Sequence, residues 1–171
     1  MSKTKTKTFL EALQTIRGTG RFHSAGAVPF VFPGLRLPDG EELSFPLPAS
    51  QVGAIRKQAE AAPYGKGIET LRDDSVRKCW QIDATELGWS EPEWEAAIAR
   101  IVKGVAAELG VEGEVVAEPY KLLLYEKGGF FLPHRDSEKL GAMFGTLIVA
   151  LPSAHSGGEL VIRHAGQEVA V

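Results

Sequence analysis

The sequence predicts an α+β fold, and three patterns lead to this prediction. Apolar runs of strand length, separated by glycine-bearing turns, fill residues 120–171. Residues 92–109 place apolar side chains at helical spacing behind a helix-start signal. In the region 28–48, Pro38-Asp39-Gly40 separates apolar segments and is typical of a β-turn.

The N-terminal half predicts a mixture of short elements. Residues 1–8, rich in Lys and Thr, are expected to form a disordered tail, and residues 9–171 a single domain. The expected elements that follow are a helix at 9–16, partial strands within 28–48, a helix at 51–61 capped by Ser50, and a strand at 76–82. Prolines keep the strands of residues 28–48 partial or at an edge, because proline cannot donate to a β-ladder.

The long helix has the clearest start signal. Ser90 is the expected N-cap, Pro92 lies in the first turn, and Glu93 completes a capping box. Gly110 ends the helix. Its apolar stripe, which we expect to be scaffold, consists of Trp94, Ile98, Ile101, Val105 and Leu109. A further strand is expected at 114–125.

Composition narrows the class of protein. The chain has 171 residues, 44% hydrophobic and 24% charged, as in ordinary globular proteins. A net charge of −3 without a basic stripe argues against a nucleic-acid partner. No apolar run is long enough to cross a membrane or to form a secretory signal. With a single cysteine, Cys79, no disulfide can form within the chain, and a cytoplasmic location is expected.

The pattern that carries chemistry is His134-Arg135-Asp136, at the end of the apolar run that begins at Phe130. On an extended strand, residues i and i+2 project from the same face. The imidazole and the carboxylate can therefore converge on one ion, while Arg135 points away. One His and one carboxylate make two-thirds of the facial triad that holds non-haem Fe(II). The plain alternative is a surface histidine beside a turn aspartate.

The C-terminal block resembles the Fe(II)/2-oxoglutarate-dependent dioxygenases, in their prolyl 4-hydroxylase-like branch. Tyr125 precedes a glycine turn that leads into Phe130-Phe131-x-x-His134-x-Asp136. An apolar strand at 146–151 follows, and then Gly157-Gly158-Glu159-Leu160 opens the next strand. The resemblance covers the last third of the chain and implies the N-terminal part of a double-stranded β-helix (a jelly roll) braced by helices.

The resemblance also implies roles for five residues. His134 and Asp136 correspond to the first two Fe(II) ligands, and Tyr125 to the tyrosine that hydrogen-bonds the co-substrate 2-oxoglutarate. A core aromatic on a buried strand is the alternative for Tyr125. Thr146 lies on a strand that lines the co-substrate pocket, although a core position is the simpler interpretation. Arg77 lies in a segment that borders the active-site mouth and can meet a substrate peptide or small molecule; a surface charge is the simpler interpretation. Oxygen is the second co-substrate.

One part of the pattern is missing. The family places a second histidine and a 2-oxoglutarate-binding basic residue well downstream, whereas His155, Arg163 and His164 all come too early. We therefore expect an N-terminal fragment whose domain is incomplete at its C-terminus. Such a chain should bind Fe(II) weakly and self-associate through its exposed C-terminal strand.

Two other functions stay open. The first is a non-catalytic jelly-roll interaction domain that has lost its iron site. The second is a zinc hydrolase built on His134 and Asp136, which needs a further His or Cys ligand that the sequence does not offer nearby.

Overall fold

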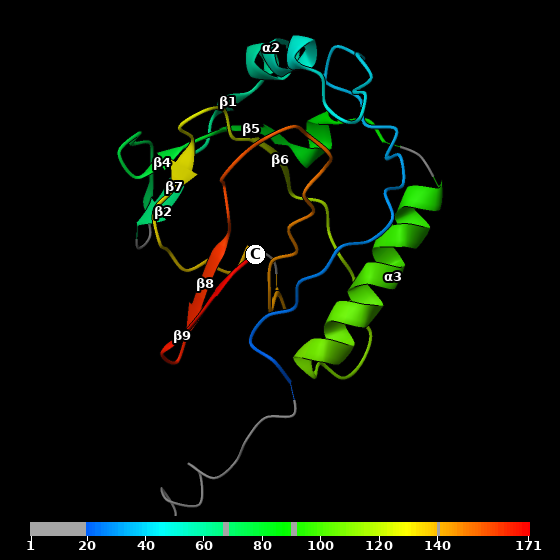
Figure 1. The fold of residues 1–171 in the computed structure, drawn as a ribbon, viewed down its shortest axis with the longest axis vertical. Helices are drawn as coiled ribbons and strands as arrows, with labels where there is room; N and C mark the ends of the chain where they lie inside the picture. The colour runs from blue at the N-terminus through cyan, green and yellow to red at the C-terminus, as the bar shows by residue number, and fades with distance from the viewer. Residues whose placement is uncertain (1–19, 67–68, 90–91, 140) are drawn as a thin grey trace, which may run out of the picture. The chain divides into compact units, whose positions relative to one another are not determined.

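The computed structural model has a mixed α+β fold with small antiparallel sheets (Figure 1). The residues that it describes are 20–66, 69–89, 92–139 and 141–171. The expected tail, the helix at 9–16 and the Ser90 cap lie outside these residues. Internal contacts divide the described residues into two compact units, which are described separately below: one contains residues of 20–28, 99–116 and 159–171, the other residues of 29–98 and 117–158.

The second unit contains a small apolar core. Its fully buried side chains come from the proline-rich segment, from the first described helix and from a central strand: Leu35, Leu37, Leu43, Ile55 and Ile82. The predicted turn at Pro38-Asp39-Gly40 is confirmed, with Gly40 at φ 90°. The segments predicted as partial strands in residues 28–48 are extended and make isolated bridges only, because their prolines interrupt the ladder.

The first described helix, α2, spans Ala49–Gln58 and buries Ile55. The prediction of Ser50 as its cap is wrong, because the helix begins two residues earlier than predicted and Pro48 occupies the N-cap position without a side-chain hydrogen bond. A proline at this position removes no hydrogen bond of the helix, since the first backbone N–H groups of a helix have no internal partner.

A three-stranded antiparallel sheet lies beside this core, in the order β1-β5-β6. Its strands are β1 (Glu60–Ala61), β5 (Trp80–Asp83) and β6 (Lys121–Leu124). A 3₁₀ turn, η1 (Ala84–Glu86), follows β5. The sequence predicts a loop at 63–67 and is ambiguous at 68–74. The loop prediction is wrong, because β2 (Tyr64–Lys66) pairs antiparallel with β3 (Glu69–Leu71). The predicted strand at 114–125 is confirmed only for its last part.

The pairing that positions the candidate site joins β4 (Arg77–Lys78) to β7 (Phe130–Phe131). Figure 1 shows these two strands side by side. The turn before β7 requires glycine, because a Cβ on Gly129 would lie 2.9 Å from the Glu126 carbonyl oxygen and 3.0 Å from that of Lys78. Gly128 has φ 74°, which glycine adopts without strain. The sequence therefore permits β4 and β7 to approach closely.

The predicted long helix is confirmed as α3, Pro92–Leu109, with Gly110 at φ 68° after its end. The predicted stripe is only half-buried, and the buried residues of the helix, Ala97, Val102 and Ala106, lie along its flanks. In the first unit, a hairpin joins β8 (Val161–His164) to β9 (Gln167–Ala170) through a turn at Ala165-Gly166. Both turn residues have positive φ, which suits a tight hairpin.

One predicted strand is not formed. The apolar run at 146–151 belongs to no β-ladder, and Leu147, Ile148 and Val149 expose 40%, 64% and 38% of their surface. Periodicity identified an apolar run but could not supply a neighbouring strand to pair with it. Among the described residues, none of the helices has both the length and the apolar character that a membrane crossing demands.

Candidate metal centre

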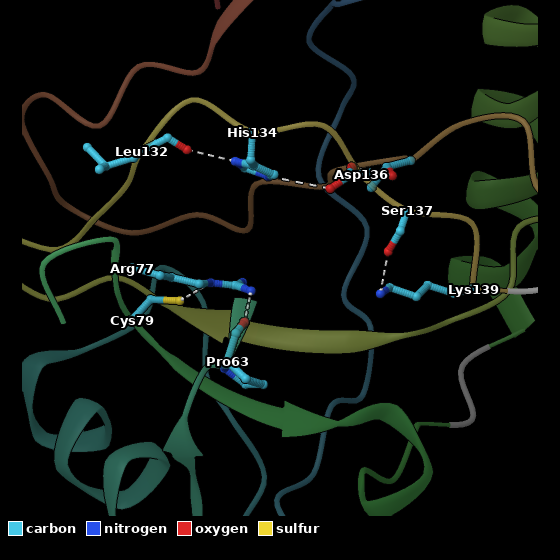
Figure 2. A network of polar contacts seen from close by, with 9 residues as sticks. Pro63, Arg77, Cys79, Leu132, His134, Asp136, Ser137 and Lys139 are labelled. Carbon is cyan, nitrogen blue, oxygen red and sulfur yellow. Dashed lines mark hydrogen bonds and ion pairs between the residues drawn. The ribbon is translucent and has the colours of Figure 1, made fainter. Parts of the chain in front are cut away.

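The candidate ligands lie immediately beyond β7. That strand ends at Phe131, so His134 and Asp136 occupy an irregular segment and not the ladder that the sequence predicts. Pro133 explains the early end, since a proline has no N–H for a further ladder bond. The expected convergence of the two side chains is nevertheless observed, because His134 Nε2 lies 3.4 Å from Asp136 Oδ1 (Figure 2).

The tautomer of His134 is set by a backbone carbonyl group two residues earlier in the chain. Its Nδ1 lies 2.8 Å from the carbonyl oxygen of Leu132, and because that oxygen only accepts, Nδ1 carries the donated proton. In the neutral imidazole, Nε2 then holds a lone pair directed at Asp136. A hydrogen bond from the second ring nitrogen to a carbonyl is the arrangement that orients metal-binding histidines.

The carboxylate of Asp136 is held from its other side. The hydroxyl of Thr146 donates a 2.7 Å hydrogen bond to Oδ2, which leaves Oδ1 facing the imidazole. Two side chains ten residues apart in the sequence are thereby brought into contact. The side chains of His134 and Asp136 keep 40% and 55% of their surface exposed, so an ion can reach them from solvent.

This arrangement suits a cation between the two side chains. A lone pair that faces a carboxylate oxygen at 3.4 Å is repelled unless a proton or a metal ion lies between them. Ligand atoms about 2.1 Å from one ion at a right angle are separated by about 3 Å, close to the observed spacing. The residues present therefore fit two ligands of a divalent metal.

No third ligand joins them within the described part of the chain, where no group of three or more His, Cys, Asp or Glu could hold a metal. His155 contacts the Ser153 carbonyl oxygen through Nδ1 at 2.9 Å. His164, in the other unit, stacks on Phe22. Arg163 forms an ion pair with Glu168 at 2.6 Å.

Tyr125 follows β6 and lies in an environment shared with Cys79 and Arg77. Partial burial, and then the neighbouring thiol of Cys79, raise the pKa of Tyr125 above its ordinary value of 10.0, while Arg77 acts in the opposite direction. The phenol is therefore protonated at neutral pH and can donate a hydrogen bond.

Arg77 makes three contacts within the second unit. Its Nε donates to Cys79 Sγ at 3.2 Å, and its Nη1 donates to the Pro63 carbonyl oxygen at 2.8 Å. Its guanidinium carbon lies 4.4 Å from the ring centroid of Phe131. Figure 2 shows Arg77 directed at Cys79 and Pro63.

Two residues at the site were not singled out from the sequence. Phe131 stacks on His134 with ring centroids 3.5 Å apart, and Cys79 links Arg77 to Tyr125. Only their positions in the sequence could have indicated these two residues. Cys79 follows Arg77 by two residues in an alternating segment, and Phe131 is the last residue of the strand before the candidate ligands.

Comparisons with protein families, with curated proteins and with solved structures found no match to this chain.

Proposed function

We propose that the chain carries the iron-binding segment of a non-haem Fe(II)/2-oxoglutarate-dependent oxygenase, a hydroxylase of the prolyl 4-hydroxylase-like branch. The observation that carries the proposal is the opposition of His134 Nε2 and Asp136 Oδ1 at 3.4 Å, with the other polar atom of each side chain already bonded. The proposal extends the observed α+β fold to the first part of a double-stranded β-helix, located in the cytoplasm.

The protein's own contribution is binding and orientation. His134 offers the Nε2 lone pair and Asp136 offers Oδ1, and both are held in place before the ion arrives. Tyr125 is the proposed hydrogen-bond donor to 2-oxoglutarate, and Thr146 orients the carboxylate ligand. When bound, iron together with 2-oxoglutarate and oxygen supplies the oxidising chemistry for C–H hydroxylation, with 2-oxoglutarate leaving as succinate and carbon dioxide. The substrate class is a peptide or a small molecule.

A binding experiment with two related acids tests the proposal. 2-Oxoglutarate can chelate a metal through its carboxylate and keto oxygens, whereas glutarate has the same length and charge but no keto group. Co(II), which resembles Fe(II) in its ligand preferences and is less prone to oxidation, serves as the probe ion. We expect calorimetry to show that the chain binds 2-oxoglutarate only when Co(II) is present, and binds it at least 10-fold more tightly than glutarate.

Two outcomes oppose the proposal. Equal affinity for the two acids would show that no chelating site exists. A chain that binds neither Co(II) nor 2-oxoglutarate would instead support the non-catalytic interaction domain. As a matched control, His134→Ala should remove metal-dependent binding, and retention of that binding would place the metal elsewhere.

A further inference from the structure

The ring of Phe131 contacts two planar polar groups, the imidazole of His134 and the guanidinium of Arg77. The imidazole of His134 is stacked on its ring with a centroid distance of 3.5 Å and an interplanar angle of 20°. The guanidinium carbon of Arg77 lies 4.4 Å from the centroid of the same ring. Two groups this close cannot share one face of a ring without overlapping, so they occupy opposite faces. The three side chains form a stack, called the Arg77–Phe131–His134 column below.

Strand pairing builds the column. Arg77 and Phe131 are direct partners in the register of β4 and β7, so their side chains lie next to each other on one face. The far end of the column is fixed by the two hydrogen bonds of Arg77, to Cys79 Sγ and to the Pro63 carbonyl oxygen. The Arg77 end of the column is thus held by Cys79 and Pro63, while His134 lies on a segment outside the ladder.

That difference gives the column its role. The imidazole of His134 lies on an irregular segment, and 40% of the side chain is exposed. Without further contacts, such a side chain would adopt several rotamers. The Phe131 ring fixes the plane of the imidazole, and the Leu132 carbonyl oxygen fixes its rotation within that plane. Together these two contacts direct Nε2 at Asp136.

We propose that Phe131 and Arg77 are positioning residues, which hold His134 in its metal-binding orientation without touching the ion. The inference rests on the proposed function, since it takes His134 and Asp136 as metal ligands. It also gives Arg77 a role other than substrate contact, because its guanidinium is engaged within the second unit. Outer partners of metal-binding histidines contribute about 10- to 100-fold to metal affinity.

The test compares Phe131→Leu, Phe131→Tyr and Arg77→Lys in the full 171-residue chain. Co(II) affinity is measured by calorimetry, and the His134 ring is observed by NMR in the metal-free protein. Phe131→Leu removes the aromatic face, and we expect about a 10-fold or greater loss of affinity. Phe131→Tyr keeps the face and should stay within about threefold of the parent. Arg77→Lys keeps the charge but loses the planar stack and the hydrogen-bond geometry, so we expect an intermediate loss.

The metal-free NMR measurement separates positioning from general destabilisation. In the parent protein, the His134 ring should be a single Nδ1–H tautomer, with proton resonances shifted upfield by the stacked Phe131 ring. Both signatures should be lost in Phe131→Leu and kept in Phe131→Tyr. Phe30→Leu, at an aromatic site that is 46% exposed, is the matched control and should leave both unchanged.

The outcomes separate this inference from the proposed function. If His134→Ala binds Co(II) as tightly as the parent, the proposed function fails, and the NMR signatures alone decide whether the column orders the ring. If Co(II) binding depends on His134 but Phe131→Leu binds as tightly as the parent, the column inference is overturned while the metal centre stands. A Phe131→Leu chain that does not fold leaves the decision to Arg77→Lys, whose parent-like affinity and NMR spectrum would also overturn the inference.

Discussion

The hydroxyl of Thr146 donates a 2.7 Å hydrogen bond to Oδ2 of Asp136, and so fixes the carboxylate whose other oxygen faces His134. Thr146 lies on no strand, and this hydrogen bond connects the apolar run at 146–151 to the candidate metal centre. Because this hydrogen bond is exposed, it adds little to the stability of the protein, and its main effect is to orient the Asp136 carboxylate.

Thr146→Val should weaken metal binding by about 10-fold, because an outer-shell hydrogen bond that orients a ligand is lost. Thr146→Ser is the matched control, since it keeps the hydroxyl, and it should bind Co(II) like the parent. Calorimetry measures both affinities. Equal affinity of the Val and Ser variants would show that the hydroxyl does not orient Asp136.

Gly129→Ala should destabilise the protein by about 1–3 kcal/mol, because the new methyl group would press on two backbone carbonyl oxygens that cannot move aside easily. Gly53→Ala offers a control of opposite sign in α2: nothing lies within 4 Å of its Cβ position. There we expect a gain of about 0.5–1 kcal/mol. Urea denaturation gives both free energies of unfolding, and a neutral Gly129→Ala would contradict the close approach of β4 to the turn.

Tyr125 should ionise only above the ordinary tyrosine pKa of 10.0. Since its pKa in the folded protein is raised above 10.0, folding favours the neutral phenol. The stability gained is complete below pH 10 and is lost as the pH rises through the raised value. Near-ultraviolet absorbance follows tyrosinate formation, and the part of the titration that Tyr125→Phe removes should lie above pH 10. If the removed part lies at or below pH 10, the partial burial of the Tyr125 phenol is contradicted.

The β8–β9 hairpin should promote self-association. Its sheet has two strands, so in the described part of the chain the outer edge of each is unpaired. Leu160 and Val171 exchange both backbone hydrogen bonds, and by alternation Ala170 directs its N–H outward. Ala170→Pro should block this edge and lower the apparent mass at high concentration in light scattering. Ala170→Ser keeps the N–H and should associate like the parent; identical behaviour of the two variants would exclude the edge.

The sequence predicted best where the signal is local. The pattern of residues 92–109 predicted α3, and single glycine-bearing turns were predicted at Gly128 and Gly166, because helix ends and positive φ depend on a few neighbouring residues. Strand pairing is not local. The run at 146–151 has strand composition but no ladder, and β7 stops at Phe131 because of Pro133.

The same limit applies to the candidate site. Alternation predicted that His134 and Asp136 converge, and they do, although the segment is irregular rather than a strand. The contacts that orient them come from Leu132, Thr146 and Phe131, and the sequence predicted none of these contacts. A backbone carbonyl or a ring stack leaves no residue pattern, since any residue carries the first and any aromatic pair permits the second.

The most direct test of the metal centre is an anaerobic calorimetric titration of Fe(II) into the 171-residue chain and into its His134→Ala and Asp136→Ala variants. The predicted result is one weak, saturable site per chain, lost in both variants. Fe(II) binding that is absent in the parent, or unchanged when either side chain is removed, would contradict the assignment of His134 and Asp136 as ligands.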